Sequence, residues 1–237
     1  MRRAWLTLAL VAGLAGCGSS GSSPSKTTTS ESSPASAPST TATTPALHGC
    51  RSVRVPAPKP NGHLSPPHLT LDPHHTYMVT IDTNCGTFAF TLNAAQSPKT
   101  SASFYSLVKQ GFFDGLTFHR VAAGFVIQGG DPTGTGAGGP GYTVVEAPPK
   151  NTQYVLGDVA MAKTQTQPAG GSGSQFFIVT APNATQSAGL TPDYALAGKV
   201  SSGIDVVERI GSLPTNPPQD GSPSPAVVMS KVTVSSS

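Results

Sequence analysis

The chain has few charged residues and few aromatic residues, and tryptophan is the rarest of them. Only 11% of its 237 residues are charged and 6% are aromatic, and the single tryptophan is Trp5, close to the N-terminus. Its 14 basic and 11 acidic side chains give a formal net charge of +3. This near balance offers little electrostatic attraction for phosphate backbones, so we expect no nucleic-acid partner.

The N-terminal apolar run is too short to span a bilayer. Residues 4–15 form a run of 12 that follows two arginines, whereas a spanning helix needs about 20 apolar residues. The run is typical of a secretory signal. It ends in LAGC at 14–17, which resembles a bacterial lipobox and implies lipidation of Cys17. We expect a lipoprotein signal peptide at 1–16 and a lipid-anchored protein on the extracytoplasmic side of the cell membrane. An ordinary signal peptide with a chance cysteine is the alternative.

The segment after the signal lacks the residues needed for a core. Residues 17–46 are almost entirely Ser, Thr, Gly, Pro and Ala, which bury too little apolar area to offset the entropy of ordering. We expect a disordered tether there and a proline-rich lead-in at 47–75. His68, His74 and His75 of the lead-in match no tight ligand spacing, so exposed loop histidines are favoured over a metal site.

Cysteine is scarce as well. If Cys17 carries lipid, Cys50 and Cys85 remain as a pair in an exported protein, where disulfides persist. We predict a bridge between them, with two free buried thiols as the alternative. Closing a loop of about 35 residues would stabilise the fold by roughly 3–4 kcal/mol on the loop-entropy model.

Residues 76–237 show regular patterns and are expected to form one domain. Apolar and polar residues alternate at 77–83 and 86–92, as in half-buried strands, and NCG at 84–86 makes the hairpin turn. Helices are predicted at 98–110 and 204–210. The first of them is expected to bury an apolar stripe of Ala102, Tyr105, Leu107 and Val108. Further strands are predicted at 117–121, 125–129, 158–162, 175–179, 195–199 and 227–234. Many short strands with only two helices predict a mainly β fold, a closed antiparallel barrel with helices at its ends.

Two features could indicate a phosphate-binding loop and a hydrolase triad, but the residues around them argue against both. The stretch PTGTGAGGPGY at 132–142 would cradle phosphate if it joined a strand to a helix, yet no helix follows and no Gly-Lys-Ser/Thr occurs. A surface loop is the favoured interpretation. A hydrolase triad would need a nucleophile elbow, and no Gly-x-Ser-x-Gly accompanies His119, the one histidine of the regular region.

The stretch FHRVAAGFVIQGGD at 118–131 places polar residues among apolar ones. Arg120 and Gln128 lie between β-branched and aromatic residues, where a buried polar group costs free energy unless it is paired. They therefore either pair or face a site. Since adjacent strand residues point to opposite faces, His119 is expected to face away from Arg120 and to be satisfied within the structure.

Three segments together resemble the cyclophilin family of peptidyl-prolyl cis–trans isomerases. They are FHRVAAGFVIQGGD, MAKTQTQPAGGSGSQFFIV at 161–179 and LTPDYALAGKV at 190–200, and the resemblance runs from about residue 77 to 234. It implies a closed eight-stranded antiparallel β-barrel capped by two α-helices. It also implies proline-containing polypeptides as partners and no metal or cofactor. We expect a monomer.

The resemblance carries over onto individual residues. It implies that Arg120 is catalytic. The implied substrate-binding residues are Phe125, Val126, Gln128, Ala162, Lys163, Gln175, Phe177, Leu190 and Tyr194. Tyr194 stands where the family has a histidine, and Gly189 lies near the position of its pocket-rim tryptophan. Without that tryptophan, strong binding of cyclosporin is not expected.

Two further departures concern neighbouring positions. Val126 stands where a methionine is common, and Lys163 stands where the family usually has asparagine. The stretch after Lys163 is also about three residues longer than usual, so a different rim is expected there.

The implied reaction breaks no covalent bond. Rotation about an X–Pro amide faces a barrier of about 18–20 kcal/mol and takes tens to hundreds of seconds uncatalysed. A guanidinium that donates to the proline nitrogen favours the twisted state over both planar ones. We expect an isomerase that assists folding of exported proteins outside the cytoplasm. A proline-segment binding module or chaperone with little catalytic activity is the alternative, and Arg120 argues against it because binding alone does not need a guanidinium there.

Overall fold

The computed structural model describes residues 49–237. The predicted signal peptide at 1–16, the lipidation site Cys17 and the tether at 17–46 lie outside the described residues. Within the described range, no helix is long and apolar enough to cross a membrane.

The described chain is mainly β, with an eleven-stranded antiparallel sheet and a separate two-stranded pair, β6 with β8. Three helices accompany the strands: α1 (Pro98–Lys109), α2 (Ala184–Ser187) and α3 (Ile204–Gly211). The strands are β1 (Tyr77–Thr83), β2 (Gly86–Leu92), β3 (Thr117–Phe118), β4 (Arg120–Ala122), β5 (Val126–Gly129), β6 (Val144–Val145), β7 (Asp158–Met161), β8 (Gly171–Ser172), β9 (Phe176–Val179), β10 (Leu196–Ser202), β11 (Thr215–Asn216), β12 (Asp220–Pro223) and β13 (Val227–Ser236).

The sheet is a curled half-barrel, so the prediction of a closed eight-stranded barrel is wrong. Its order is β11-β12-β4-β5-β9-β7-β10-β2-β1-β13-β3, and the edge strands β11 and β3 do not pair with each other. The predicted strand 117–121 is interrupted at His119, because β3 pairs with β13 while β4 pairs with β5 and β12. Since β12 occupies the second edge of β4, that edge is not available to close the sheet.

The predicted elements are found with different accuracy. Strands β1 and β2 have the predicted bounds and form the predicted hairpin, with Thr83 opposite Gly86. The other predicted strands end within a few residues of the observed ones, and both predicted helices exist. The sequence pattern did not predict β6, β8, β11, β12 or α2. These elements have two to four residues each, which is too short to show a period.

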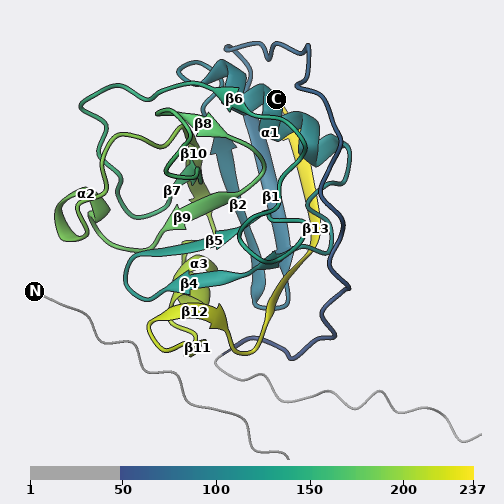
Figure 1. Cartoon of the computed structure of the whole chain (residues 1–237), viewed down its shortest axis with the longest axis vertical. Helices are drawn as coiled ribbons and strands as arrows, with labels where there is room; N and C mark the ends of the chain where they lie inside the picture. Colours follow the sequence, from purple (N-terminus) through teal and green to yellow (C-terminus); the bar gives the residue numbers. More distant parts are fainter. Residues whose placement is uncertain (1–48) are drawn as a thin grey trace, which may run out of the picture. The chain divides into compact units, whose positions relative to one another are not determined.

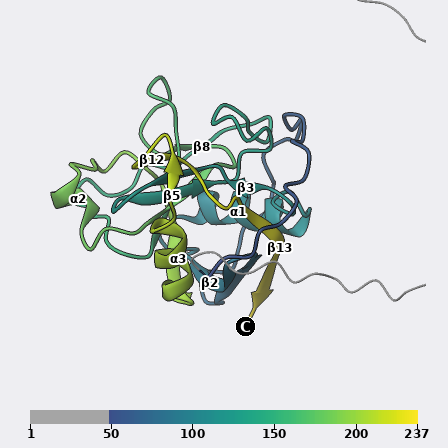
Figure 2. The same ribbon diagram turned by 90° about the horizontal axis from the view of Figure 1, so that it is seen from below.

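The two longer helices pack on the sheet (Figures 1 and 2). Helix α1 contacts β13 and β10, and α3 contacts β2 and β5. Phe104 of α1 is fully buried and stacks on Phe113 with ring centroids 4.8 Å apart. The predicted apolar stripe of α1 named Tyr105 instead, which is only partly buried and packs edge-on against Tyr77. The aromatic cluster around Phe104 anchors α1 to the core.

The lead-in from residue 49 to 75 is an extended segment along the outside of the sheet (Figure 1). The Cys50–Cys85 disulfide joins its start to the β1–β2 hairpin, which confirms the predicted bridge. Further along, the N–H of Lys59 donates to the carbonyl of Pro132 at 2.8 Å, and the N–H of Gly62 donates to Gly139 at 2.9 Å. These bonds attach the lead-in to the stretch PTGTGAGGPGY at 132–142, which is called the glycine-rich loop below.

The lead-in histidines that the structure describes, His63, His68, His74 and His75, are exposed. In the part of the chain that the structure describes, no three His, Cys, Asp or Glu side chains gather as metal ligands, and this includes His68, His74 and His75.

Candidate functional site

One face of the curled sheet carries a row of side chains from three neighbouring strands. Arg120 on β4 lies directly opposite Gln128 on β5, and Gln128 lies directly opposite Phe177 on β9. Alternate residues of a strand share a face, so Val126 joins this row while Ile127 packs into the main core. The register of the three strands thus places Arg120, Gln128 and Phe177 side by side.

The guanidinium of Arg120 is bound from two sides. Its Nη1 donates to Gln128 Oε1 at 3.1 Å, while Nε and Nη2 donate to the two carboxylate oxygens of Asp220 at 2.7 and 2.8 Å. Gln128 Nε2 in turn donates to Gln175 Oε1 at 3.1 Å. The Arg120 side chain keeps 35% of its surface exposed. The guanidinium is therefore oriented by its neighbours and still accessible to a ligand.

Gln175 connects this row to the glycine-rich loop. Its Nε2 donates to the carbonyls of Gly136 and Gly138 at 3.0 and 2.9 Å. Asp131, which is almost fully buried, ties the same loop from within by accepting bonds from the N–H and hydroxyl of Thr133. Burial raises the pKa of Asp131, but the bonds from Thr133, Gly138 and Gly136 outweigh it and leave the pKa below its usual value. The loop is thus an ordered wall beside the site.

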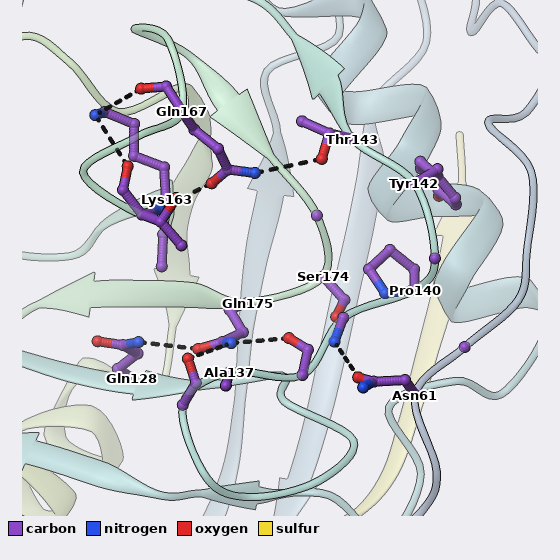
Figure 3. A pocket seen from close by; sticks show the side chains of 18 residues that line it. Asn61, Gln128, Ala137, Pro140, Tyr142, Thr143, Lys163, Gln167, Ser174 and Gln175 are labelled. Carbon is purple, nitrogen blue, oxygen red and sulfur yellow. Dashed lines mark hydrogen bonds between the residues drawn. The ribbon is translucent and has the colours of Figure 1, made fainter.

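A hollow of about 490 Å³ opens between this wall and the stretch after β7 (Figure 3). Gln128 and Gln175 line one side of it, and Lys163 and Gln167 line the other. Gln167 Nε2 donates to Thr143 Oγ1 at 3.3 Å, and Lys163 Nζ donates to the Gln167 carbonyl at 3.3 Å. The longer stretch that the sequence predicted after Lys163 therefore forms a rim with its own hydrogen bonds.

An apolar cluster lies beside the hydrogen-bonded row and is separate from the main core. The Tyr194 ring meets the Phe177 ring edge-on, with centroids 5.3 Å apart, and Lys163 Nζ lies 5.8 Å from the centroid of the Tyr194 ring. The cluster includes six of the predicted binding residues: Phe125, Val126, Ala162, Phe177, Leu190 and Tyr194. With Arg120, Gln128, Gln175 and Lys163 beside it, all ten predicted site residues lie together.

This arrangement suits one kind of chemistry. An oriented guanidinium beside an apolar surface binds and stabilises a polarised group without forming a bond to it. His119, the residue a hydrolase would need, takes part in none of the hydrogen bonds of the row.

The sequence comparisons identify the family. Residues 78–234 match the family of cyclophilin-type peptidyl-prolyl cis-trans isomerases. The chain belongs to the cyclophilins. It is a peptidyl-prolyl cis–trans isomerase, as its curated relatives are.

Two relatives and one solved structure illustrate the similarity. Peptidyl-prolyl cis-trans isomerase-like 1 of Rhizopus delemar is 38% identical over 142 residues, covering 58% of this chain and 82% of that protein. Peptidyl-prolyl cis-trans isomerase B of Bacillus subtilis is 41% identical over 124 residues, covering 52% and 82%. A cyclophilin-type isomerase of Cryptosporidium parvum, solved in the presence of the dipeptide Ala-Pro, superposes with a TM-score of 0.59 at 30% identity. That superposition covers 67% of this chain and 98% of that one.

Tyr154 belongs to the site of this cyclophilin although no sequence signal points to it. It is fully buried, and its hydroxyl donates to the carbonyl of Tyr194 at 2.6 Å and accepts from the Tyr194 N–H at 3.1 Å. Burial raises the pKa of Tyr154 to about 12, so the hydroxyl stays protonated at neutral pH. Tyr154 thereby fixes the backbone that carries the Tyr194 ring.

Asp220 is the second residue that sequence reasoning missed. It lies 100 positions from Arg120, on β12, which pairs with β11 and β4. The Asp-Gly pair at 220–221 is a turn signal, but a turn signal does not show which strand the turn will join.

The rim of the apolar cluster is open next to Leu190. Gly189 has a φ of 64°, in the left-handed region that favours glycine, and a Cβ at this position would meet nothing within 4 Å. The rim therefore carries no side chain at Gly189, the residue that the resemblance places near the family's tryptophan.

His119 differs from expectation in one respect. Both ring nitrogens are buried, and neither has a hydrogen-bond partner among residues 49–237, so the expected satisfied histidine is not found. Burial lowers the pKa of His119, with Asp131 raising it and Arg120 lowering it by smaller amounts. Burial of both ring nitrogens favours the neutral imidazole.

Proposed function

We propose that this cyclophilin isomerises X–Pro bonds of exported proteins outside the cytoplasm, anchored to the membrane by a lipid on Cys17. The lipobox-like LAGC at 14–17 and the preceding apolar run support export and lipidation. The Cys50–Cys85 disulfide agrees with this location, because disulfides persist in oxidising compartments.

Arg120 is the proposed catalytic residue, and the observation that carries the proposal is its guanidinium, bound to Gln128 beside an apolar cluster. As the X–Pro bond twists, the lone pair localises on the proline nitrogen and becomes a hydrogen-bond acceptor. A donor already aimed there stabilises the twisted state and not the planar ones. Removing one such preorganised donor from other enzymes costs about 100- to 1000-fold in rate.

The remaining predicted residues receive binding roles. Phe125, Val126, Phe177 and Leu190 are proposed to hold the proline ring, with Tyr194 as one edge of the slot. The N–H of Ala162 already donates to the Gln175 carbonyl at 2.9 Å, so the Ala162 carbonyl is the group proposed to pair with substrate backbone. Lys163 and Gln175 would flank the chain that precedes the proline, in the hollow that they line. The Ala-Pro dipeptide present with the Cryptosporidium relative supports proline-containing polypeptides as substrates.

The test is the isomerisation rate of a chromogenic X–Pro tetrapeptide. Residues 47–237 should accelerate cis-to-trans conversion, and Arg120→Ala should lose about 100-fold or more while keeping its unfolding temperature. Arg54→Ala is the matched control, because Arg54 is exposed on the lead-in. If Arg120→Ala retained the wild-type rate, the catalytic assignment would fail. A wild-type protein that binds the peptide but converts it no faster than buffer would favour the binding-module alternative.

A further inference from the structure

The hairpin formed by β11 and β12 carries Asp220 to the catalytic face. Asp220 pairs with Ala122 of β4 and Gly221 pairs with Val121, while the N–H of Ala123 donates to the Gln219 carbonyl at 2.8 Å. Asp220 therefore lies opposite the residue two positions after Arg120, on the same face of the sheet. This is the diagonal neighbour position, which long side chains bridge readily.

The hairpin is fixed in place by close packing at its tip. A Cβ added to Gly221 would lie 2.4 Å from the backbone of Asn216, so only glycine fits there. The Ser222 hydroxyl donates to the His119 carbonyl at 3.2 Å, and Pro223 is buried. Asp220 is thus presented from an ordered backbone rather than from a free loop.

The ion pair uses much of the hydrogen-bonding capacity of Arg120. A guanidinium has five N–H groups in a planar fork. Two of them bind the two oxygens of Asp220 and one binds Gln128, which leaves two for a substrate. The neutral bond to Gln128 alone would allow the group to rotate about its long side chain, whereas a bidentate carboxylate fixes its plane.

The Arg120–Asp220 ion pair is expected to contribute little to the stability of the fold. The side chains of Arg120 and Asp220 are 35% and 54% exposed, and exposed ion pairs contribute little to folding. The chain contains a comparable exposed pair on α3, where Arg209 contacts Asp205 through one oxygen at 3.2 Å. The two-oxygen contact is made at Arg120, the residue whose orientation the proposed reaction requires.

We propose that Asp220 is a positioning residue for isomerisation, which holds the Arg120 guanidinium in the plane from which its two remaining N–H groups meet the substrate. The proposal rests on the catalytic role proposed for Arg120. Asp220 itself does not touch the reacting amide. It lowers the conformational freedom of the group that does, and so affects the rate of rotation more than the binding of the peptide.

The decisive variant is Asp220→Asn in the full chain, which keeps the size of the side chain but removes its charge and one acceptor. We expect kcat for the X–Pro tetrapeptide to fall about fivefold, which corresponds to the upper end of measured couplings for exposed ion pairs. KM and the unfolding temperature should stay within error of wild type. Asp220→Glu, which restores the bidentate carboxylate, should recover most of the loss.

Three further measurements separate positioning from a general electrostatic effect. Asp205→Asn removes the other exposed Arg–Asp pair and should leave kcat unchanged. Rising salt concentration screens an exposed pair, so it should lower kcat of the wild type towards that of Asp220→Asn. The Nε–H resonance of Arg120, assigned by its loss in Arg120→Lys, should be protected from exchange with water in wild type and lose that protection in Asp220→Asn.

The outcomes that overturn the proposal are specific. An unchanged kcat in Asp220→Asn shows that Gln128 suffices, and a raised kcat shows that Asp220 weakens the guanidinium instead of placing it. A loss confined to KM, or one that follows the unfolding temperature, indicates substrate contact or structural support. If Arg120→Ala is slow and Asp220→Asn is not, only the positioning role fails, whereas a fully active Arg120→Ala overturns the proposed function as well.

Discussion

Replacing Tyr154 by phenylalanine tests how the apolar side of the site is built. The substitution removes only the hydroxyl, which makes both side-chain hydrogen bonds of Tyr154, to the carbonyl and the N–H of Tyr194. The ring still fills its buried position and keeps its edge-on contact with the Tyr194 ring, with centroids 6.4 Å apart. The change therefore isolates two hydrogen bonds without creating a cavity.

The expected cost follows from these two bonds. A typical intramolecular hydrogen bond contributes about 0.5–1.5 kcal/mol, and a backbone group left unpaired away from water costs about 1–3 kcal/mol. Tyr194 is partly exposed, so water satisfies part of what is lost. We expect the free energy of unfolding to fall by about 2 kcal/mol, which lowers the unfolding temperature of a domain of this size by roughly 4–8 °C.

The kinetic effect of Tyr154→Phe should differ from that of Asp220→Asn, for which a loss of kcat is expected. Loosening the Tyr194 backbone disturbs the ring that meets Phe177, so KM should rise more than kcat falls. Urea and thermal unfolding, together with the X–Pro tetrapeptide assay, measure these effects. Tyr105→Phe is the matched control, because the Tyr105 hydroxyl forms no hydrogen bond within the described residues.

Alkaline titration gives an independent check on the same hydroxyl. The pKa of Tyr154 is about 12 in the folded protein and about 10 when unfolded, so only the unfolded chain ionises between these values. The free energy of unfolding should fall by up to about 1.4 kcal/mol per pH unit in this window, and this contribution should vanish in Tyr154→Phe. If Tyr154→Phe were as stable as Tyr105→Phe, the hydroxyl would not be what holds Tyr194.

Two further predictions concern His119 and Cys17. Burial lowers the pKa of His119, so the unfolded chain takes up a proton first as the pH drops below about 6.5, and stability should fall from there downward. Urea titrations at several pH values should show a smaller fall in His119→Gln, and an identical fall would contradict the buried neutral ring. Cys17→Ser should move the protein from the membrane fraction to the soluble fraction of the producing cells, because the lipid is its expected anchor. Retention of the variant on membranes would refute the lipid anchor.

Local patterns explain why much of the fold was predictable. The β1–β2 hairpin combines strict alternation with a turn of suitable residues, and both strands have the predicted bounds. The Cys50–Cys85 bridge followed from counting cysteines in a chain expected to be exported. The ten site residues lie in the three sequence stretches that carry the family resemblance, so the resemblance predicts that they form one site.

The errors have a common cause, which is pairing between distant segments. The predicted closure of the barrel failed because the short hairpin β11–β12 occupies the edge of β4, and elements of two to four residues leave no periodic trace. The predicted stripe of α1 does not include Phe104. A stripe shows only which way side chains point, whereas the burial of Phe104 depends on the aromatic rings of Phe90 and Phe113 that surround it.

By itself, the sequence determined the classes of residue available to the site: an arginine, two glutamines and a set of apolar side chains in a strand-rich chain. It also determined the alternation that directs them to one face, because side-chain direction in a strand follows from the order of residues. Only the tertiary structure decided that Asp220 binds the guanidinium of Arg120 and that the Tyr154 hydroxyl binds the backbone of Tyr194. A hydrogen bond depends on the distance between two atoms, and for segments 100 and 40 residues apart that distance is set by the packing of the whole domain.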